Sequence, residues 1–254
     1  MNRQLSVFIP AYDEEGNIED TVRELRTALD AQVDLTYEII IVNDGSTDRT
    51  GEIADALARA DPAIRVVHNP QNLGLAKTFW VGVHAAKCEY IGWIPGDNGF
   101  PAASLKKWLA PLGQADLIQT YLLNTEVRYL NRRLVSKAYT LTMNALFGLN
   151  LKYYNGIQIC RRDIFLSVTT HADSFALLSE VLVKLISRGC SYIEVGLNMQ
   201  ERAQGQSKAV KLQNIWDVML TVVRLVIEIK FIYRSRYRSR GEKLPWDPAV
   251  VNQP

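Results

Sequence analysis

The sequence predicts an α/β fold: a doubly wound, mainly parallel sheet with helices on both faces. Short apolar runs alternate with segments whose apolar residues recur at helical spacing. The runs are apolar throughout and do not alternate with polar residues, which is typical of strands buried on both faces of a parallel sheet. Five runs are expected to form strands: 6–9, 38–42, 64–67, 90–94 and 116–122.

Helices are predicted between these strands, because apolar residues there stand three or four positions apart. The first two helices are indicated by Ile18, Val22, Leu25 and Leu29, and by Ile53, Leu57 and Ala60. Further helical stretches are expected near 75–87 and 104–112.

The composition is that of an ordinary globular protein. Of 254 residues, 48% are hydrophobic and 22% are charged, which excludes an intrinsically disordered chain. The formal net charge of +2 gives no indication of a nucleic-acid partner. No run of ~18 apolar residues occurs, and the apolar stretch near the N-terminus is short enough to be a strand and not a signal peptide. Three scattered cysteines favour reduced thiols over a disulfide framework or a zinc site.

Polar residues follow three of the expected strands at the point where each ends. These are Pro10-Ala11-Tyr12-Asp13-Glu14-Glu15, Asn43-Asp44-Gly45-Ser46-Thr47-Asp48 and Pro95-Gly96-Asp97-Asn98-Gly99. In a doubly wound sheet, ligands bind at the carboxyl ends of the strands. Any one of these loops alone is ordinary turn and helix-cap chemistry. Three acid-bearing loops at one edge predict a binding site.

Several common catalytic signatures are absent from the sequence. It contains no GxGxxG, no GxxxxGK[ST], no HExxH and no GxSxG, and only three histidines. These absences disfavour a dinucleotide enzyme, a P-loop enzyme, a zinc peptidase and a serine hydrolase.

The loops resemble the motifs of family-two glycosyltransferases, which have the GT-A fold. The resemblance rests on VFIPAYDEEGNI, EIIIVNDGSTDRT, NPQNLGLAKTF and WIPGDNGFP, and it covers about residues 5–210. Two later segments, NGIQICRRDIF and EVGLNMQERAQGQSK, are similar to the dolichyl-phosphate mannose synthase branch. The resemblance implies an inverting enzyme that moves a hexose from a GDP- or UDP-linked sugar to a polyprenyl or dolichyl phosphate.

The resemblance also implies which residues bind the donor. Base and ribose would be held by Pro10, Tyr12, Glu14, Val42 and Asp44, with Gly96 in the third loop. The diphosphate needs cations, and the matching positions are Arg128, Arg202 and Lys208, with Lys77 close by.

The metal motif departs from the family pattern. Asp97 is the one acid retained, because Pro95 and Gly99 occupy two positions where the family usually has ligands. A Mg²⁺ or Mn²⁺ ion can bind through one carboxylate completed by phosphates and water. Asp97 is therefore expected to hold the metal weakly or only together with the donor, unless the cations replace the metal.

The acceptor determines whether a general base is needed. A phosphate monoester has a second pKa of ~6 and is already an anion near neutral pH, so it needs only positioning groups. Arg132 and Ser136 are four residues apart on an expected helix and match the lipid-phosphate pair of the branch, with Arg133 as the alternative cation. A saccharide hydroxyl would need a base, and Glu180 stands where the superfamily often has a functional acid. A third hypothesis is a non-catalytic nucleotide-sugar-binding subunit with a degenerate metal motif.

The chain is expected to divide into a catalytic domain at 1–210, an apolar and basic interfacial helix at 211–240 and an irregular tail at 241–254. The segment 212–240 carries a narrow polar stripe and ends in four spaced arginines: Arg234, Arg236, Arg238 and Arg240. This pattern favours a helix docked on an anionic membrane surface over one packed on a protein partner. The expected location is therefore peripheral, at the cytoplasmic face of a membrane.

Overall fold

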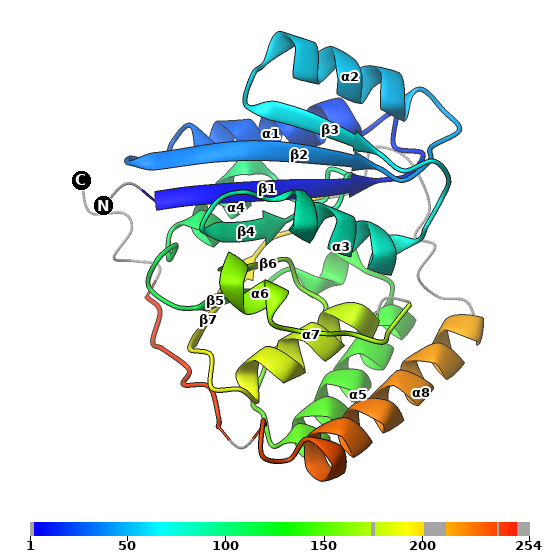
Figure 1. Cartoon of the computed structure of the whole chain (residues 1–254), viewed down its shortest axis with the longest axis vertical. Helices are drawn as coiled ribbons and strands as arrows, with labels where there is room; N and C mark the ends of the chain where they lie inside the picture. The colour runs from blue at the N-terminus through cyan, green and yellow to red at the C-terminus, as the bar shows by residue number, and fades with distance from the viewer. Residues whose placement is uncertain (1–2, 174–175, 201–211, 238, 248–254) are drawn as a thin grey trace.

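The computed structural model describes residues 3–173, 176–200, 212–237 and 239–247. One seven-stranded sheet organises the chain, with strand order β3-β2-β1-β4-β6-β5-β7 (Figure 1). The strands are β1 (Arg3–Ala11), β2 (Leu35–Asn43), β3 (Ile64–His68), β4 (Tyr90–Trp93), β5 (Leu117–Leu122), β6 (Gln158–Arg161) and β7 (Tyr192–Leu197). The five strands expected from the sequence are all present, and the predicted α/β class with a mainly parallel sheet is confirmed.

Most strand pairs are parallel. β1 lies between β2 and β4 and pairs in parallel with both, with Phe8 opposite Ile40 on one side and Trp93 on the other. β6 runs antiparallel to both of its neighbours, β4 and β5. β7 then pairs in parallel with β5. The four parallel strands β1 to β4 therefore all end at one edge of the sheet.

Helices cover both faces of the sheet. They are α1 (Ile18–Leu29), α2 (Thr50–Ala60), α3 (Leu75–Ala85), α4 (Ala102–Leu109), α5 (Leu130–Phe147), α6 (Arg162–Leu166), α7 (Ala176–Ile186) and α8 (Leu212–Ile227). Figure 1 shows α3 in front of the sheet and α1 behind it, and α1 contacts α4. The ridge that predicts α1 is buried as expected, because its four apolar residues face the sheet.

Aromatic side chains fill the core between α3 and the sheet. The ring of Phe79, on α3, makes edge-to-face contacts with Phe8, Trp93 and Phe165 at centroid distances of 5.2–5.9 Å. Gly82 allows this close approach, since an added Cβ would lie 2.3 Å from the Phe8 ring. The strands that carry the site loops are therefore fixed by dense packing.

The last helices lie at the end of the molecule opposite to α2 (Figure 1). Every residue of α7 is buried, and α7 contacts α8. A single π-helical turn, η2 (Glu228–Ile232), continues α8. Residues 239–247 then run beside β7, where the Tyr192 amide donates to the carbonyl of Glu242 at 2.9 Å. In the described part of the chain, no helix combines the length and the apolar character that crossing a bilayer requires.

Truncation of the central ring tests the packing. Phe79→Ala is expected to lower the free energy of unfolding by about 3–5 kcal/mol, because it leaves a cavity among three aromatic rings. The measurement is urea denaturation followed by circular dichroism. Phe231→Ala is the matched control, because Phe231 is 73% exposed; its expected loss is below about 0.5 kcal/mol. Equal losses for the two variants would contradict the assigned core.

Candidate active site

The three polar loops meet at the carboxyl edge of the sheet. The Asp44 amide donates to the Ala11 carbonyl at 2.9 Å, and the Gly96 amide donates to the Pro10 carbonyl at 3.2 Å. Thr21 joins the third loop to α1, because its hydroxyl donates to the Gly96 carbonyl and accepts from the Asn98 amide. The backbone of β1 therefore carries the other two loops on either side of its end.

Side chains tie the first loop to the second. The Thr47 amide donates to Asp13 at 2.8 Å, and the Glu15 amide donates to Asp48 at 3.1 Å. Burial raises the pKa of Asp48, but hydrogen bonds from Thr50 and the Glu15 amide outweigh it and hold that pKa below its usual value. The carboxylates of Asp13 and Asp48 thus link the first loop to the second.

Asp44 is buried at the centre of this edge. Its carboxylate accepts hydrogen bonds from the Asn69 side chain at 2.8 Å, the Leu73 amide at 2.9 Å and the Gly74 amide at 3.0 Å. It therefore fixes the loop 69–74, which leads into α3. Its expected part in binding the donor base stays a prediction.

The other expected base and ribose residues surround Asp44. Pro10 is the penultimate residue of β1, and Val42, fully buried, is the penultimate residue of β2. Tyr12 and Glu14 follow β1 and are half-buried. The Glu14 carboxylate accepts a hydrogen bond from the Asn17 side-chain amide at 2.7 Å, and this bond orients Glu14 beside the start of α1. The structure thus brings the expected base-binding residues to one side of the edge.

Asp97 lies in the loop after β4, with 6% of its surface exposed. The loop is held by a residue that follows β7, the last strand in the sheet order. The Gln200 amide donates to the Gly99 carbonyl at 3.0 Å, and the Gln200 side chain donates to the Asn98 carbonyl at 2.8 Å. Asn98 has a left-handed backbone, with φ of 51°. Residues that follow β7 therefore set the position of Asp97.

The donor atoms in this loop suit a hard cation. Asn98, the residue that follows Asp97, has a buried side-chain oxygen with no hydrogen-bond partner among the described residues. No cluster of three His, Cys, Asp or Glu side chains occurs in the described ranges. An oxygen-only set this small fits Mg²⁺ or Mn²⁺ where phosphate oxygens and water complete the coordination shell.

Arg128 reaches the same region. Its guanidinium donates to the Tyr153 hydroxyl at 2.9 Å and contacts the Met199 sulfur at 3.2 Å. Met199 in turn packs on Gly99, where an added Cβ would lie 3.4 Å from the Met199 methyl group. The Arg128 Nε is buried and has no hydrogen-bond partner among the described residues. The structure thus supports a cation one side chain away from the Asp97 loop. Arg202 and Lys208 lie outside the described residues.

Lys77 is exposed on α3 and lines a separate cavity of about 300 Å³. The opposite wall is the loop between α6 and α7, including Thr169, Thr170 and His171. Trp80, which also lines the cavity, joins its two walls: the indole N–H donates to the Thr170 hydroxyl at 2.8 Å. The N-terminus of α3, which precedes Lys77 by one turn, is the part that Asp44 holds.

Arg132 and Ser136 are half-buried on α5, on the same side as the fully buried Met143. Arg133 is exposed. The pair is therefore turned toward the body of the protein, whereas its alternative is turned to solvent.

Glu180 is 2% exposed in the middle of α7. Its carboxylate accepts the amides of His171 and Ala172 at 2.9–3.1 Å and forms an ion pair with Lys184 at 2.8 Å. These contacts use both oxygens, so the geometry supports a structural role more than that of a general base.

A comparison with protein-family models matches residues 6–169 to glycosyl transferase family 2. The chain belongs to this family. The match covers the three site loops and α3, and it confirms the family that the loop motifs predict.

Relatives of this glycosyl transferase family 2 member include lipid-phosphate enzymes. It is 27% identical to the dolichol-phosphate mannosyltransferase of Pyrococcus furiosus over 88% of this chain and 64% of that protein. It is 38% identical to an uncharacterized glycosyltransferase, EpsJ, of Bacillus subtilis over 41% of this chain and 28% of that protein. The yeast dolichol-phosphate mannosyltransferase is 24% identical, over 82% of both chains. The chain thus spans 64% of the length of the Pyrococcus protein and 28% of the length of EpsJ.

Solved structures share the fold. A glucosyl-3-phosphoglycerate synthase of Mycobacterium tuberculosis, solved with Mn²⁺, UDP and phosphoglyceric acid, superposes with a TM-score of 0.64 at 21% identity. The superposition covers 89% of this chain and 78% of that one. The likeness confirms the predicted GT-A-type architecture.

The sequence did not single out Asn124, Met199 and Gln200 as site residues. Asn124 exchanges two hydrogen bonds with the backbone of Met199, at 2.7 and 2.8 Å, and so ties the end of β5 to the end of β7. Met199 and Gln200 belong to the same sequence motif as Arg202, and this was the one signal in the sequence that could have indicated them. Their contact with the Asp97 loop spans about a hundred residues and is invisible in local spacing.

Removal of one charge at Asp44 tests its role as the anchor of the loop 69–74. Asp44→Asn replaces an acceptor oxygen by an N–H group that faces backbone amides, so the free energy of unfolding is expected to fall by about 1–3 kcal/mol. Nucleotide affinity should fall with it, since α3 loses its anchor. Urea denaturation and calorimetry with UDP and GDP measure the two effects.

Asp163→Asn is the matched control, because the Asp163 side chain is 65% exposed and pairs only at the surface with Arg161. Its expected loss is about 0–1 kcal/mol. Similar losses for the two variants would show that Asp44 does not anchor the loop.

Proposed function

We propose that the chain is an inverting glycosyltransferase that moves a hexose from a GDP- or UDP-linked sugar to a polyprenyl or dolichyl phosphate. The proposed place of the reaction is the cytoplasmic face of a membrane. The proposal rests on one observation above the others, the two unlike faces of α5.

The face of α5 that is turned toward the protein carries Arg132 and Ser136. The opposite face exposes Leu130 at 65% and Leu134 at 59%, and Val135, at 65%, is exposed on the flank between the two faces. An acceptor that is a phosphate at one end and a hydrocarbon at the other requires these two environments side by side. A saccharide acceptor gives no reason for the apolar face.

The relatives support the same acceptor class. Dolichol-phosphate mannosyltransferases and dolichyl-phosphate β-glucosyltransferases are among the proteins that this chain resembles. Their names differ in the sugar and agree on the lipid phosphate. The donor sugar therefore stays open, while the acceptor class is part of the proposal.

Asp97, the amide oxygen of Asn98 and the nearby Arg128 form the donor end of the proposed reaction. A bound Mg²⁺ or Mn²⁺ would neutralise charge on the diphosphate as it leaves. Arg128 has a buried Nε–H without a partner in the described part of the chain, and its charge can stabilise the same oxygens. Asp97 and Asn98 would hold the cation, with the diphosphate supplying the further ligands.

The acceptor phosphate would be held by Arg132 and Ser136 and attack through one of its oxygens. That oxygen forms a bond to the anomeric carbon while the bond from this carbon to the diphosphate oxygen breaks, and the electron pair leaves with the nucleoside diphosphate. Attack from the opposite face inverts the configuration. No base is required, which agrees with a Glu180 carboxylate already engaged by two amides and Lys184.

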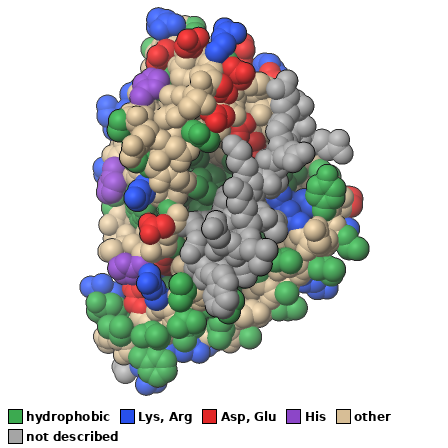
Figure 2. All heavy atoms as spheres, turned by 90° about the vertical axis from the view of Figure 1, so that its right-hand side faces the viewer, with side chains coloured by type: hydrophobic (Ala, Val, Ile, Leu, Met, Phe, Trp, Pro, Cys, Tyr) green, Lys and Arg blue, Asp and Glu red, His purple; other side chains and the backbone are tan. Residues whose placement is uncertain are grey.

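The membrane side of the proposal rests on α5 together with α8 and η2. Phe231 is 73% and Ile232 63% exposed, and Arg234 and Arg236 follow them. Further exposed apolar residues of this segment are Met219, Leu220, Val223, Ile227 and Tyr233. Figure 2, which views the side of α5 and α8, shows hydrophobic side chains gathered along the lower part of the molecule. A surface of this kind, bordered by arginines, suits an anionic bilayer.

Transfer of radiolabelled sugar to dolichyl phosphate in detergent tests the proposed function. A panel of GDP- and UDP-linked hexoses is supplied, and label is counted in the organic phase after extraction. Arg132→Gln is expected to raise the KM for the lipid phosphate at least about tenfold, since it removes a charge-assisted contact. Arg133→Gln is the matched control and should stay within about twofold, because Arg133 faces solvent.

Three outcomes would oppose the proposal. Label that stays in the aqueous phase on an added saccharide would favour a hydroxyl acceptor. Donor binding with no transfer under any metal would favour the non-catalytic subunit. Asp97→Asn protein with normal turnover, or turnover undiminished by EDTA, would remove Asp97 and the metal from the mechanism.

Sedimentation with vesicles tests the membrane surface. Replacement of Phe231 and Ile232 by Ser is expected to weaken binding to phosphatidylcholine–phosphatidylserine vesicles at least about tenfold, because two side chains leave the hydrocarbon boundary. Val33→Ser is the control, since Val33 is 78% exposed on the connection between α1 and β2. Unchanged sedimentation of the double variant would exclude this segment as the docking surface.

A further inference from the structure

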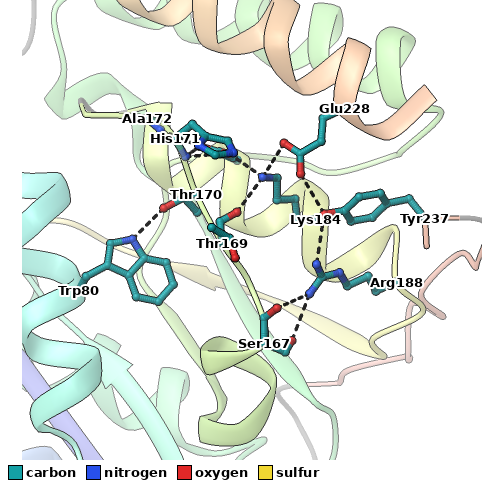
Figure 3. A network of polar contacts seen from close by, with 11 residues as sticks. Trp80, Ser167, Thr169, Thr170, His171, Ala172, Lys184, Arg188, Glu228 and Tyr237 are labelled. Atoms are coloured by element: carbon teal, nitrogen blue, oxygen red, sulfur yellow. Dashed lines mark hydrogen bonds and ion pairs between the residues drawn. The ribbon is translucent and has the colours of Figure 1, made fainter. Parts of the chain in front are cut away.

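Lys184, on α7, is a fully buried cation, with 0% of its surface exposed. Its ammonium group lies 2.8 Å from Glu180 on the same helix. It also lies 2.7 Å from Glu228 on η2 (Figure 3). A charge removed from water is costly unless it is paired and hydrogen-bonded. Two carboxylates from separate parts of the chain meet that requirement here.

The same buried charges hold the loop between α6 and α7. Lys184 donates to the Thr169 carbonyl at 2.7 Å, and Glu180 accepts the amides of His171 and Ala172. Arg188, two residues beyond the end of α7, donates to the Ser167 carbonyl at 2.7 Å. Residues 167–172 form no strand or helix after α6 ends, so these side chains satisfy backbone groups that would otherwise lack partners.

The C-terminal part of the chain supplies the other end of this network. Tyr237 is 8% exposed, and its hydroxyl lies 3.2 Å from both Glu228 and Arg188. The Arg188 guanidinium also lies over the Tyr237 ring, at 5.1 Å from its centre. Figure 3 shows the sequence of contacts from Tyr237 and Glu228 through Lys184 to the loop. The residues 228–237 are thereby bonded to the loop 167–172 through α7.

This loop is one wall of the cavity of about 300 Å³ whose other wall is α3 with Lys77 and Trp80. The indole N–H of Trp80 donates across to Thr170 in the middle of the loop. A shift of the loop therefore changes the cavity and breaks this bond. Lys77 lies one turn from the end of α3 that Asp44 holds, so the cavity borders the donor edge.

We propose that Lys184 and Glu228 are positioning residues, through which the segment 228–237 sets the shape of the loop 167–172 and of the cavity that it lines. The consequence for catalysis rests on the proposed function: a C-terminal segment seated on a membrane would hold the cavity in the form that binds donor. The positioning itself does not depend on that function.

Amide exchange and one indole resonance test the proposal without any substrate. In Glu228→Gln and in Tyr237→Phe, hydrogen exchange of the His171 and Ala172 amides is expected to accelerate about tenfold, because the loop opens more often. The Trp80 indole signal, assigned by its loss in Trp80→Phe, should shift or broaden. The indole signals of Trp93 and Trp108, which lie in the core, should stay unchanged.

Glu242→Gln is the matched control, because Glu242 also lies in the C-terminal part and its side chain is exposed. It should leave the exchange rates and the Trp80 signal as in the wild type. Lys184→Met is the stronger variant and should accelerate exchange further. If it does not fold, Glu228→Gln and Tyr237→Phe carry the test, since both leave Lys184 paired with Glu180. Exchange in Glu228→Gln equal to that in Glu242→Gln would overturn the proposal.

A kinetic measurement separates positioning from general loss of structure. With the nucleotide-sugar found in the transfer assay, Glu228→Gln should raise the donor KM about fivefold and leave kcat within about twofold, because donor excess restores the cavity. A fall in kcat with unchanged KM would contradict a positioning role at this cavity. If wild-type protein transfers no sugar while the exchange result holds, the proposed function fails and the positioning stands.

Discussion

The parallel pairing of β1 with both β2 and β4 is the constraint on which the candidate site depends. Parallel neighbours lie ~4.8 Å apart and end at one edge, so the chain segments that follow them must meet. The hydrogen bonds from Asp44 to Ala11 and from Gly96 to Pro10 continue this pairing into the loops. Asp44, Asp97 and the residues after β1 are close because of strand direction and not because of their own attraction, which between carboxylates is repulsive.

The antiparallel strand β6 explains how the second half of the chain reaches the same edge. β6 separates β4 from β5, and β7 then follows β5 in parallel. The end of β7 therefore emerges beside the Asp97 loop, where Gln200 binds the backbone of Asn98 and Gly99. The loop that carries Asp97, with Pro95 and Gly99 on either side of it, thus has a fixed backbone. Such fixation favours a ligand set completed by the donor over a preformed cage.

The sequence predicted the first five strands because they are apolar enough to be buried on both faces. It did not predict β6, whose four residues are Gln158, Ile159, Cys160 and Arg161 and carry little strand pattern. The spacing of Glu180 and Lys184 within a helix was visible, but their third partner, Glu228, comes from a distant turn that no local pattern connects to α7. Glu180 therefore resembled an available acid, whereas its partners show it to be occupied. The site loops were found because their chemistry lies at strand ends; the network was missed because it depends on tertiary contacts.

The first two turns of α5 differ from an ordinary surface helix, which buries its apolar stripe: there the half-buried residues are polar and the apolar ones are exposed, whereas a later turn buries Met143 in the usual way. Among its long side chains, the half-buried Arg132 lies on the inner side, whereas Leu130, Leu134 and Val135 are exposed. In water these apolar side chains stay exposed, whereas full burial in a bilayer would lower the free energy by about 1.5–3 kcal/mol for each of them. The same turns of the helix carry a half-buried cation on one side and exposed apolar side chains on the other. On the proposed function, α5 is then the element that matches an amphipathic acceptor, and α8 with η2 extends the surface on which that acceptor is presented.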